Sequence, residues 1–160
     1  MIKRLFITSF IMLATFGLQA QSDLYSKLST FISNQTKEST NDRLIAINVW
    51  SVNNDNSRKL NAEFEEVYKT FEYAKLKGGG HGIIVMDINF ENDNVNADIT
   101  LQKDGIKKLI KVSADNTEIV NHLKGKSAGY NIVFDCKGNL LYENLAPGTV
   151  FNSIQKLITR

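Results

Sequence analysis

Two short apolar runs, separated by a long stretch of helical period, constrain the fold of this chain most strongly. The first run, Leu44–Trp50 (LIAINVW), is interrupted only by Asn48, and the second is Ile83–Ile88 (IIVMDI). Between them, apolar residues recur every three or four positions from Ser57 to Lys77, which predicts an amphipathic helix. Two buried strands joined by a helix imply a parallel pair with a right-handed crossover.

The remaining patterns predict a mixed sheet between helices. Tyr130–Phe134 and Asn139–Tyr142 resemble strands and flank a four-residue turn that ends in glycine, which is typical of a hairpin. Helical spacing predicts a first helix over Ser22–Glu38 and a last one from Val150 to Ile158. Shorter elements are expected between the strands: a helix over Val95–Lys103, an edge strand over Leu109–Val112 and a helix over Asn116–Leu123. This order predicts an α/β fold with a mixed central sheet and helices on both faces.

The first twenty residues have the pattern of an export signal. Lys3 and Arg4 precede an apolar run that ends at Leu18, and Ala20 is a small residue suited to cleavage. A membrane anchor needs about 20 apolar residues, which is longer than this run. We therefore expect a cleaved signal peptide over residues 1–20, an N-terminal helix and linker over 21–43, and one domain over 44–160. The mature protein is then periplasmic or secreted, without a membrane span.

Charge and ligand-forming residues exclude several classes of function. Without Lys3 and Arg4, 17 of the 19 basic residues remain and equal the 17 acidic residues in number, so the mature chain is formally neutral. Neither nucleic acid nor a membrane surface is therefore an expected partner. Cys136 is the only cysteine and cannot form an internal disulfide, which leaves a free thiol or a covalent homodimer. His81 and His122 have no ligand-like spacing to each other or to Cys136, so we expect no metal or other cofactor.

The glycine-rich segment Gly78–Gly82 (GGGHG) superficially suggests a phosphate-binding loop. Such loops precede a helix whose N-terminus meets the anion, whereas a predicted strand follows this one. We therefore expect the segment to end the preceding helix and to form a flexible connection.

Four segments in order resemble the thioredoxin-like fold, and in particular the exported thiol-disulfide oxidoreductases of bacterial envelopes. They are LIAINVW before a long helix, IIVMDINFEND, IVFDCKGNLLY, and the last helix after Pro147-Gly148. The resemblance extends from Leu44 to Ile158. It implies a three-layer sandwich, to which this chain adds an N-terminal helix.

The resemblance places the redox site of the family directly after Trp50, but this chain has Asn54 and Ser57 at the two cysteine positions. Thiol exchange requires a thiolate at the helix start and a second thiol to resolve the mixed disulfide. The position of the family's cis-proline corresponds to Gly129, for which we expect a trans bond, because a non-proline cis bond costs about 2.5–4 kcal/mol. The resemblance therefore implies a site without redox chemistry.

Three hypotheses follow for the function. In the first, the chain is a redox-inactive module of the cell envelope that binds a peptide or protein partner. Its binding surface consists of the degenerate redox-site positions, which are Trp50, Asn54, Asp55, Asn56, Ser57 and Gly129. In the second, it is a divergent thiol-disulfide oxidoreductase or peroxidase-like enzyme that uses Cys136 with an external thiol. In the third, it is a structural domain without chemistry of its own.

Overall fold

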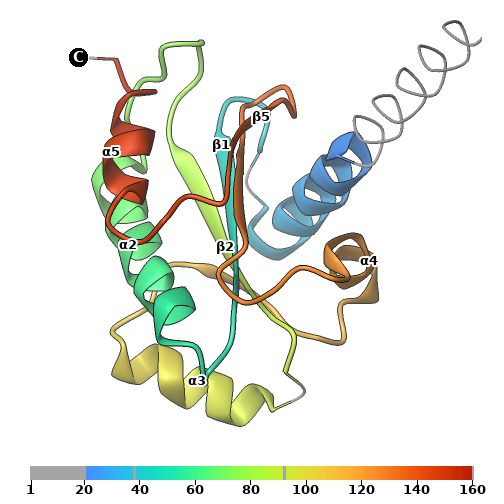
Figure 1. Ribbon diagram of the computed structural model, residues 1–160. Coiled ribbons are helices and arrows are strands. Elements are labelled where there is room, and N and C mark those ends of the chain that lie inside the picture. The colour runs from blue at the N-terminus through green and yellow to red at the C-terminus, as the bar shows by residue number, and fades with distance from the viewer. Residues whose placement is uncertain (1–20, 38, 92, 160) are drawn as a thin grey trace, which may run out of the picture.

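The computed structural model describes residues 21–37, 39–91 and 93–159, which form a five-stranded sheet covered by helices on both faces (Figure 1). The strand order is β3-β2-β1-β4-β5. β1, β2 and β3 are parallel, whereas β4 runs antiparallel to β1 and β5 antiparallel to β4. The strands are β1 Leu44–Trp50, β2 Ile83–Asn89, β3 Ile110–Val112, β4 Asn131–Phe134 and β5 Leu140–Glu143. The predicted parallel crossover and closing hairpin are both confirmed.

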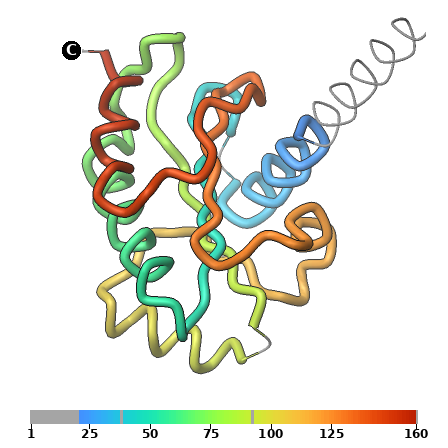
Figure 2. Tube along the Cα trace, in the orientation of Figure 1, coloured from blue at the N-terminus to red at the C-terminus, as the bar shows by residue number. Residues whose placement is uncertain are grey.

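The helices divide between the two faces of the sheet, as Figures 1 and 2 show. The long helix α2 (Asp55–Phe71) packs with α5 (Val150–Gln155) and α3 (Asn94–Lys103) on one face. The N-terminal helix, residues 21–36, lies on the other face with α4 (Thr117–Val120) and the 3-10 turn η1 (Asn121–Leu123). The sequence alone does not decide whether the N-terminal helix packs on the domain. In the structure it does, because Leu24, Leu28 and Ile32 are buried against the sheet.

Alternation of side chains along the buried strands assigns each residue to one of these faces. In β1, Ile45, Ile47 and Val49 belong to the core beneath the N-terminal helix, whereas Leu44, Ala46 and Trp50 belong to the core beneath α2. In β2, residues 84, 86 and 88 face the N-terminal helix and residues 83 and 85 face α2. By the same alternation, the polar residues at positions 48, 87 and 89 lie on the α2 face.

Helix α2 ends at Phe71, six residues before the predicted end at Lys77. The chain turns back because the N–H of Gly82 donates to the carbonyl of Ala74, with an N···O distance of 2.8 Å. A Cβ atom at position 82 would lie 2.0 Å from the backbone oxygen of Glu72, and φ there is +77°, so only glycine permits this approach. The prediction that the Gly78–Gly82 segment ends the helix is therefore wrong, because α2 stops at Phe71. Within the segment, Gly82 packs closely on the backbone of Glu72, whereas Gly78 and Gly79 are exposed.

The last helix also ends before the predicted position. α5 stops at Gln155, and Ile158 instead forms a β-bridge with Leu76. The carbonyl of Leu157 accepts a hydrogen bond from the N–H of Lys77 at 2.8 Å. Apolar spacing alone does not distinguish a helical turn from an extended tail that packs on the same surface. The other predicted elements agree with the observed ones to within two residues.

Candidate functional site

The loop between β1 and α2 is held by hydrogen bonds of Asn54 and Ser57, the two residues that the resemblance placed at cysteine positions. Asn54 is the N-cap of α2, and its Oδ1 accepts from the N–H of Ser57 at 2.8 Å. The Ser57 hydroxyl donates to the carbonyl of Asn54 at 2.8 Å and accepts from the N–H of Ser51 at 3.2 Å. Ser57 is fully buried. These two side chains thus stabilise the start of the helix, and neither can form a thiolate.

Gly129 lies beside this loop. Its N–H donates to the carbonyl of Val49 at 2.7 Å, and its φ of +97° belongs to the left-handed region that favours glycine. A Cβ atom built there would lie 3.9 Å from Cδ1 of Leu60 in α2. No cis peptide bond occurs among the described residues, which confirms the expected trans bond. The structure therefore brings Gly129 to the helix start that the resemblance implied.

Exposure divides the hypothesised binding residues into two groups. Asp55 and Asn56 are exposed, and Asn54 and Gly129 are partly exposed. In contrast, Trp50 is 2% exposed and Ser57 is completely covered. A partner that docks on this surface can touch only the first group directly, whereas Trp50 and Ser57 support the surface from beneath.

A row of polar side chains crosses the sheet below this loop, and the sequence analysis did not identify it. Asn131 in β4 pairs in register with Asn48 in β1, Asn48 pairs with Asp87 in β2, and Asp87 pairs with Lys111 in β3. The first three are at most 2% exposed. The signal available in the sequence was a polar residue inside a largely apolar strand. In both β1 and β2 this residue lies two positions before the end of the strand. Only the register between strands aligns these residues.

The asparagines of this row have structural partners. Asn48 Nδ2 donates to the carbonyl of Ser57 at 3.0 Å and to Oδ1 of Asn61 at 2.7 Å, which ties β1 to α2. Asn131 Nδ2 donates to the carbonyl of Leu145 at 2.9 Å, and its Oδ1 accepts from the N–H of the same residue at 2.9 Å. These contacts hold the loop that follows β5 against β4.

The Oδ1 atoms of Asp87 and Asn48 have no hydrogen-bond partner among the described residues, and of the two residues only Asp87 can ionise. Burial raises the pKa of this carboxyl to about 7, and the nearby Lys111 ammonium only partly opposes that effect. Asp87 is therefore a buried acid whose burial favours the protonated form, and it lies beside Asn48 in the neighbouring strand.

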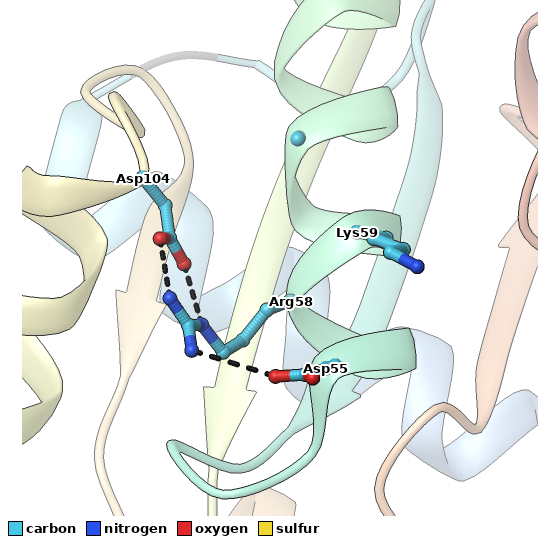
Figure 3. Close-up of a pocket in the computed structure, with 5 residues that line it drawn as sticks. Asp55, Arg58, Lys59 and Asp104 are labelled. Carbon is cyan, nitrogen blue, oxygen red and sulfur yellow. Dashed lines mark hydrogen bonds and ion pairs between the residues drawn. The ribbon is translucent and has the colours of Figure 1, made fainter.

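An open pocket of about 290 Å³ lies on the outer side of the same helix start (Figure 3). The Arg58 guanidinium crosses it and forms a bidentate ion pair with Asp104, with distances of 2.8 Å from Nε to Oδ2 and 2.6 Å from Nη2 to Oδ1. Nη1 also lies 3.6 Å from the Asp55 carboxylate. Arg58 thus pairs with both carboxylates of this pocket, and its ion pair with Asp104 ties α2 to the end of α3.

We predict that Arg58→Ala lowers the free energy of unfolding at pH 7 by about 1–2 kcal/mol, because a bidentate and partly covered ion pair is lost. Arg58→Lys keeps the charge but not the fork and should lose roughly half as much. The hydrogen bond from Arg58 lowers the pKa of Asp104, so the contribution of the pair falls as the pH drops below about 4. Urea denaturation at pH 7 and pH 3 measures both effects. Equal stabilities of the three proteins at pH 7 would contradict this role.

Cys136 lies at the other end of the sheet, in the turn between β4 and β5. Phe134 pairs with Ile45 near the start of β1, whereas Trp50 ends that strand. The thiol is partly buried, and the carbonyl of Cys136 accepts a hydrogen bond from the Tyr25 hydroxyl at 3.1 Å. The structure therefore does not bring the only thiol to the Asn54–Ser57 loop.

The two histidines are also apart from this loop. His81 is exposed in the glycine-rich segment, and His122 Nε2 lies 3.3 Å from a carboxylate oxygen of Asp23. Within residues 21–37, 39–91 and 93–159, no group of three or more His, Cys, Asp or Glu side chains is arranged to hold a metal ion. In the same ranges, no helix is long and apolar enough to cross a membrane.

Comparison with solved structures places this architecture among thioredoxin folds. The thioredoxin domain of a thiol-disulfide oxidoreductase from Bacteroides vulgatus superposes with a TM-score of 0.60 at 11% identity, over 75% of this chain and 82% of that chain. A thiol-disulfide oxidoreductase from Bacteroides fragilis gives a TM-score of 0.56 at 16% identity, over 73% and 82%. A thiol:disulfide interchange protein of the thioredoxin family from Chlorobium tepidum gives 0.56 at 13%, over 75% and 83%.

These identities are too low to transfer an activity, and they establish the fold alone. No family model and no curated protein matches the sequence. The chain therefore has a thioredoxin-like fold, similar to that of bacterial thiol-disulfide oxidoreductases, with asparagine and serine at the two positions that the resemblance assigned to cysteine.

Proposed function

We propose that this chain is a thioredoxin-like protein of the cell envelope that binds an extended peptide or protein segment and does not exchange thiols. The observation that carries the proposal is the chemistry of Asn54 and Ser57. An amide and a hydroxyl replace the attacking and resolving thiols, and both side chains are engaged in capping α2. The thiol of Cys136 lies at the far end of the sheet and cannot substitute for either.

The surface around the helix start supports a role in binding. Asp55 and Asn56 are exposed in the first turn of α2, where backbone N–H groups have no partners within the helix. The Gly129 backbone lies beside them and carries no side chain to block an approaching strand. A segment in extended conformation can present carbonyl groups to such donors. The apolar run that follows Lys3 and Arg4 supports export, although residues 1–20 lie outside the described part of the chain.

Redox inactivity is tested by insulin reduction with dithiothreitol as the electron source. We predict that the purified protein gives no turnover above buffer and that Cys136→Ser behaves identically. A thioredoxin with an intact pair of cysteines serves as the positive control. Turnover that disappears in Cys136→Ser would contradict the proposal and support an enzyme that acts through this thiol.

Partner binding is tested by photo-crosslinking in the native envelope from position 56, which is exposed at the centre of the proposed surface. The matched control carries the same photoreactive residue at position 152, where an exposed asparagine lies in the first turn of α5. We predict a discrete adduct with one partner from position 56 only. Asn56→Arg in the unlabelled protein should then lower its affinity for that purified partner about tenfold or more, whereas Asn152→Arg should not. Identical adducts from both positions would refute the proposed surface.

A further inference from the structure

A second hollow, separate from the loop surface, lies at the carboxyl ends of the three parallel strands. It has a volume of about 250 Å³. Its lining includes Trp50 of β1, Asp87 and Asn89 of β2, and Ala97, Asp98 and Leu101 of α3. Ligands of open α/β sheets bind at this end of the strands, where the loops and helices diverge. The hollow is smaller than a pocket for a drug-sized molecule, which occupies about 300–1,000 Å³.

Three polar atoms of the side chains that line this hollow have no hydrogen-bond partner among the described residues: Trp50 Nε1, Asp87 Oδ1 and Asn89 Nδ2. The side chains belong to residues that are 2%, 2% and 5% exposed. The orientation of the Asn89 amide is fixed, because its Oδ1 accepts from the N–H of Glu91 at 2.6 Å and Nδ2 remains as a donor. Buried polar groups in folded proteins are almost always paired. Six such atoms occur among the described residues, and three of them belong to side chains that line this hollow, which makes it a candidate site for a polar ligand.

The charges around the hollow define the chemistry of that ligand. The indole and amide N–H groups of Trp50 and Asn89 are donors, and Lys111, whose ammonium group is paired with Asp98, also lines the hollow. The carboxylates are Asp87 inside and Asp98, whose Oδ1 lies 2.6 Å from Lys111 Nζ. Donors with a cation suit a carboxylate, whereas the aspartates suit an ammonium group. Leu101, Ala97 and Val112 supply an apolar wall for a small side chain.

We propose that this hollow binds a free α-amino acid with a small aliphatic side chain. Its carboxylate would accept hydrogen bonds from Trp50 Nε1 and Asn89 Nδ2, and its ammonium group would face Asp87. Burial raises the pKa of Asp87 and the Lys111 ammonium only partly opposes this effect, which agrees with a carboxyl whose charge a bound ammonium group would stabilise further. Trp50 lies beneath the proposed peptide surface and also lines this hollow, but no lining residue lies in the segment from Asn54 to Ser57, so the hollow excludes the exposed residues of that surface.

Trp50 provides a specific reporter because it is the only tryptophan of the chain. The experiment titrates the twenty free amino acids, one at a time, into the ¹⁵N-labelled protein as it is purified after expression of the full-length chain. The readout is the indole ¹H–¹⁵N resonance. We expect at least one aliphatic amino acid to shift this resonance in a saturable manner at micromolar to millimolar concentration. The N-acetylated and the deaminated analogues of that amino acid should bind at least about tenfold more weakly, because each lacks the ammonium group.

Two isosteric variants test the assignment of the groups. Asp87→Asn removes the carboxylate that faces the ammonium, and Asn89→Asp replaces the amide donor with a charge that repels the ligand carboxylate. Each should weaken binding by about tenfold or more. Glu66→Gln makes the same acid-to-amide change at an exposed position of α2 and should bind normally. The dispersion of the amide spectrum verifies that each variant is folded.

Three results would overturn the proposal. The indole resonance does not respond to any amino acid, which means that the hollow holds solvent only. The analogues without an ammonium group bind as well as the amino acid does, which means that the ligand is a simple carboxylate. Both isosteric variants keep the affinity of the unmodified protein, which means that binding occurs elsewhere. A failure of the crosslinking experiment at position 56 changes none of these outcomes, because it probes a different surface.

Discussion

Replacing Asp87 with asparagine is expected to remove most of the pH dependence of the free energy of unfolding between about pH 4 and pH 7. Asp87 is 2% exposed, and burial raises the pKa of its carboxyl to about 7 in the folded protein. In the unfolded chain the pKa returns to about 3.9. The folded state therefore holds a proton that the unfolded state releases within this window.

The sign of the effect follows from this difference in proton binding. The stabilising contribution is fully present below about pH 4, and it is lost as the pH rises towards 7, where the folded protein must bury the charge. A difference of about three pKa units corresponds to about 4 kcal/mol at most. In Asp87→Asn the group at position 87 no longer titrates, so the variant should be more stable than the unmodified protein at pH 8 by up to that amount.

Urea denaturation at pH 5 and pH 8 measures this effect. The groups that act on Asp87 are Lys111, Asp98 and Glu65, and all three remain in the variant. Glu66→Gln, which removes an exposed carboxylate from the same helix as Glu65, controls for the change in net charge. If the unmodified protein and Asp87→Asn lose the same free energy of unfolding between pH 5 and pH 8, the Asp87 carboxylate is not buried in the folded protein, which would contradict the structure.

The parts of the fold that the sequence predicted correctly are those that local patterns specify. The crossover from Leu44–Trp50 through the long helix to the second strand follows from apolar spacing, and the closing hairpin follows from its turn residues. The ends of α2 and α5 were not predictable in this way. They are set by the approach of Gly82 to the backbone of Glu72 and by the bridge between Leu76 and Ile158, which join residues distant in sequence.

The candidate site likewise has one part that could be predicted from the sequence and one part that could not. The position of the Asn54–Ser57 loop and its proximity to Gly129 followed from the resemblance, because both belong to a known arrangement of segments. The hollow with Asp87 and Asn89 did not, because it depends on the register that sets Asn48 beside Asp87 and Trp50 beside Asn89. A single polar residue inside an apolar strand has no distinctive meaning until its neighbours across the sheet are known.

Trp50→Ala is expected to lower the free energy of unfolding by about 3–5 kcal/mol, because it removes a large side chain that is 2% exposed and leaves a cavity between the sheet and α2. Trp50→Phe keeps most of the apolar volume and removes an indole N–H that has no partner among the described residues. The free energy of unfolding of Trp50→Phe should therefore fall by less than about 1.5 kcal/mol. Far-UV circular dichroism in urea is the appropriate measurement, since both variants lack the only tryptophan.

This prediction determines which variants can test binding. If Trp50→Ala loses several kcal/mol, its failure to bind a partner or an amino acid reports partial unfolding and not the loss of a contact. Asn56→Arg at the exposed surface and the isosteric Asp87→Asn avoid this ambiguity, because neither opens a cavity nor buries a new charge. A Trp50→Ala protein as stable as Trp50→Phe would show that the indole is not packed in the core. Trp50 could then contact a partner at the loop surface directly.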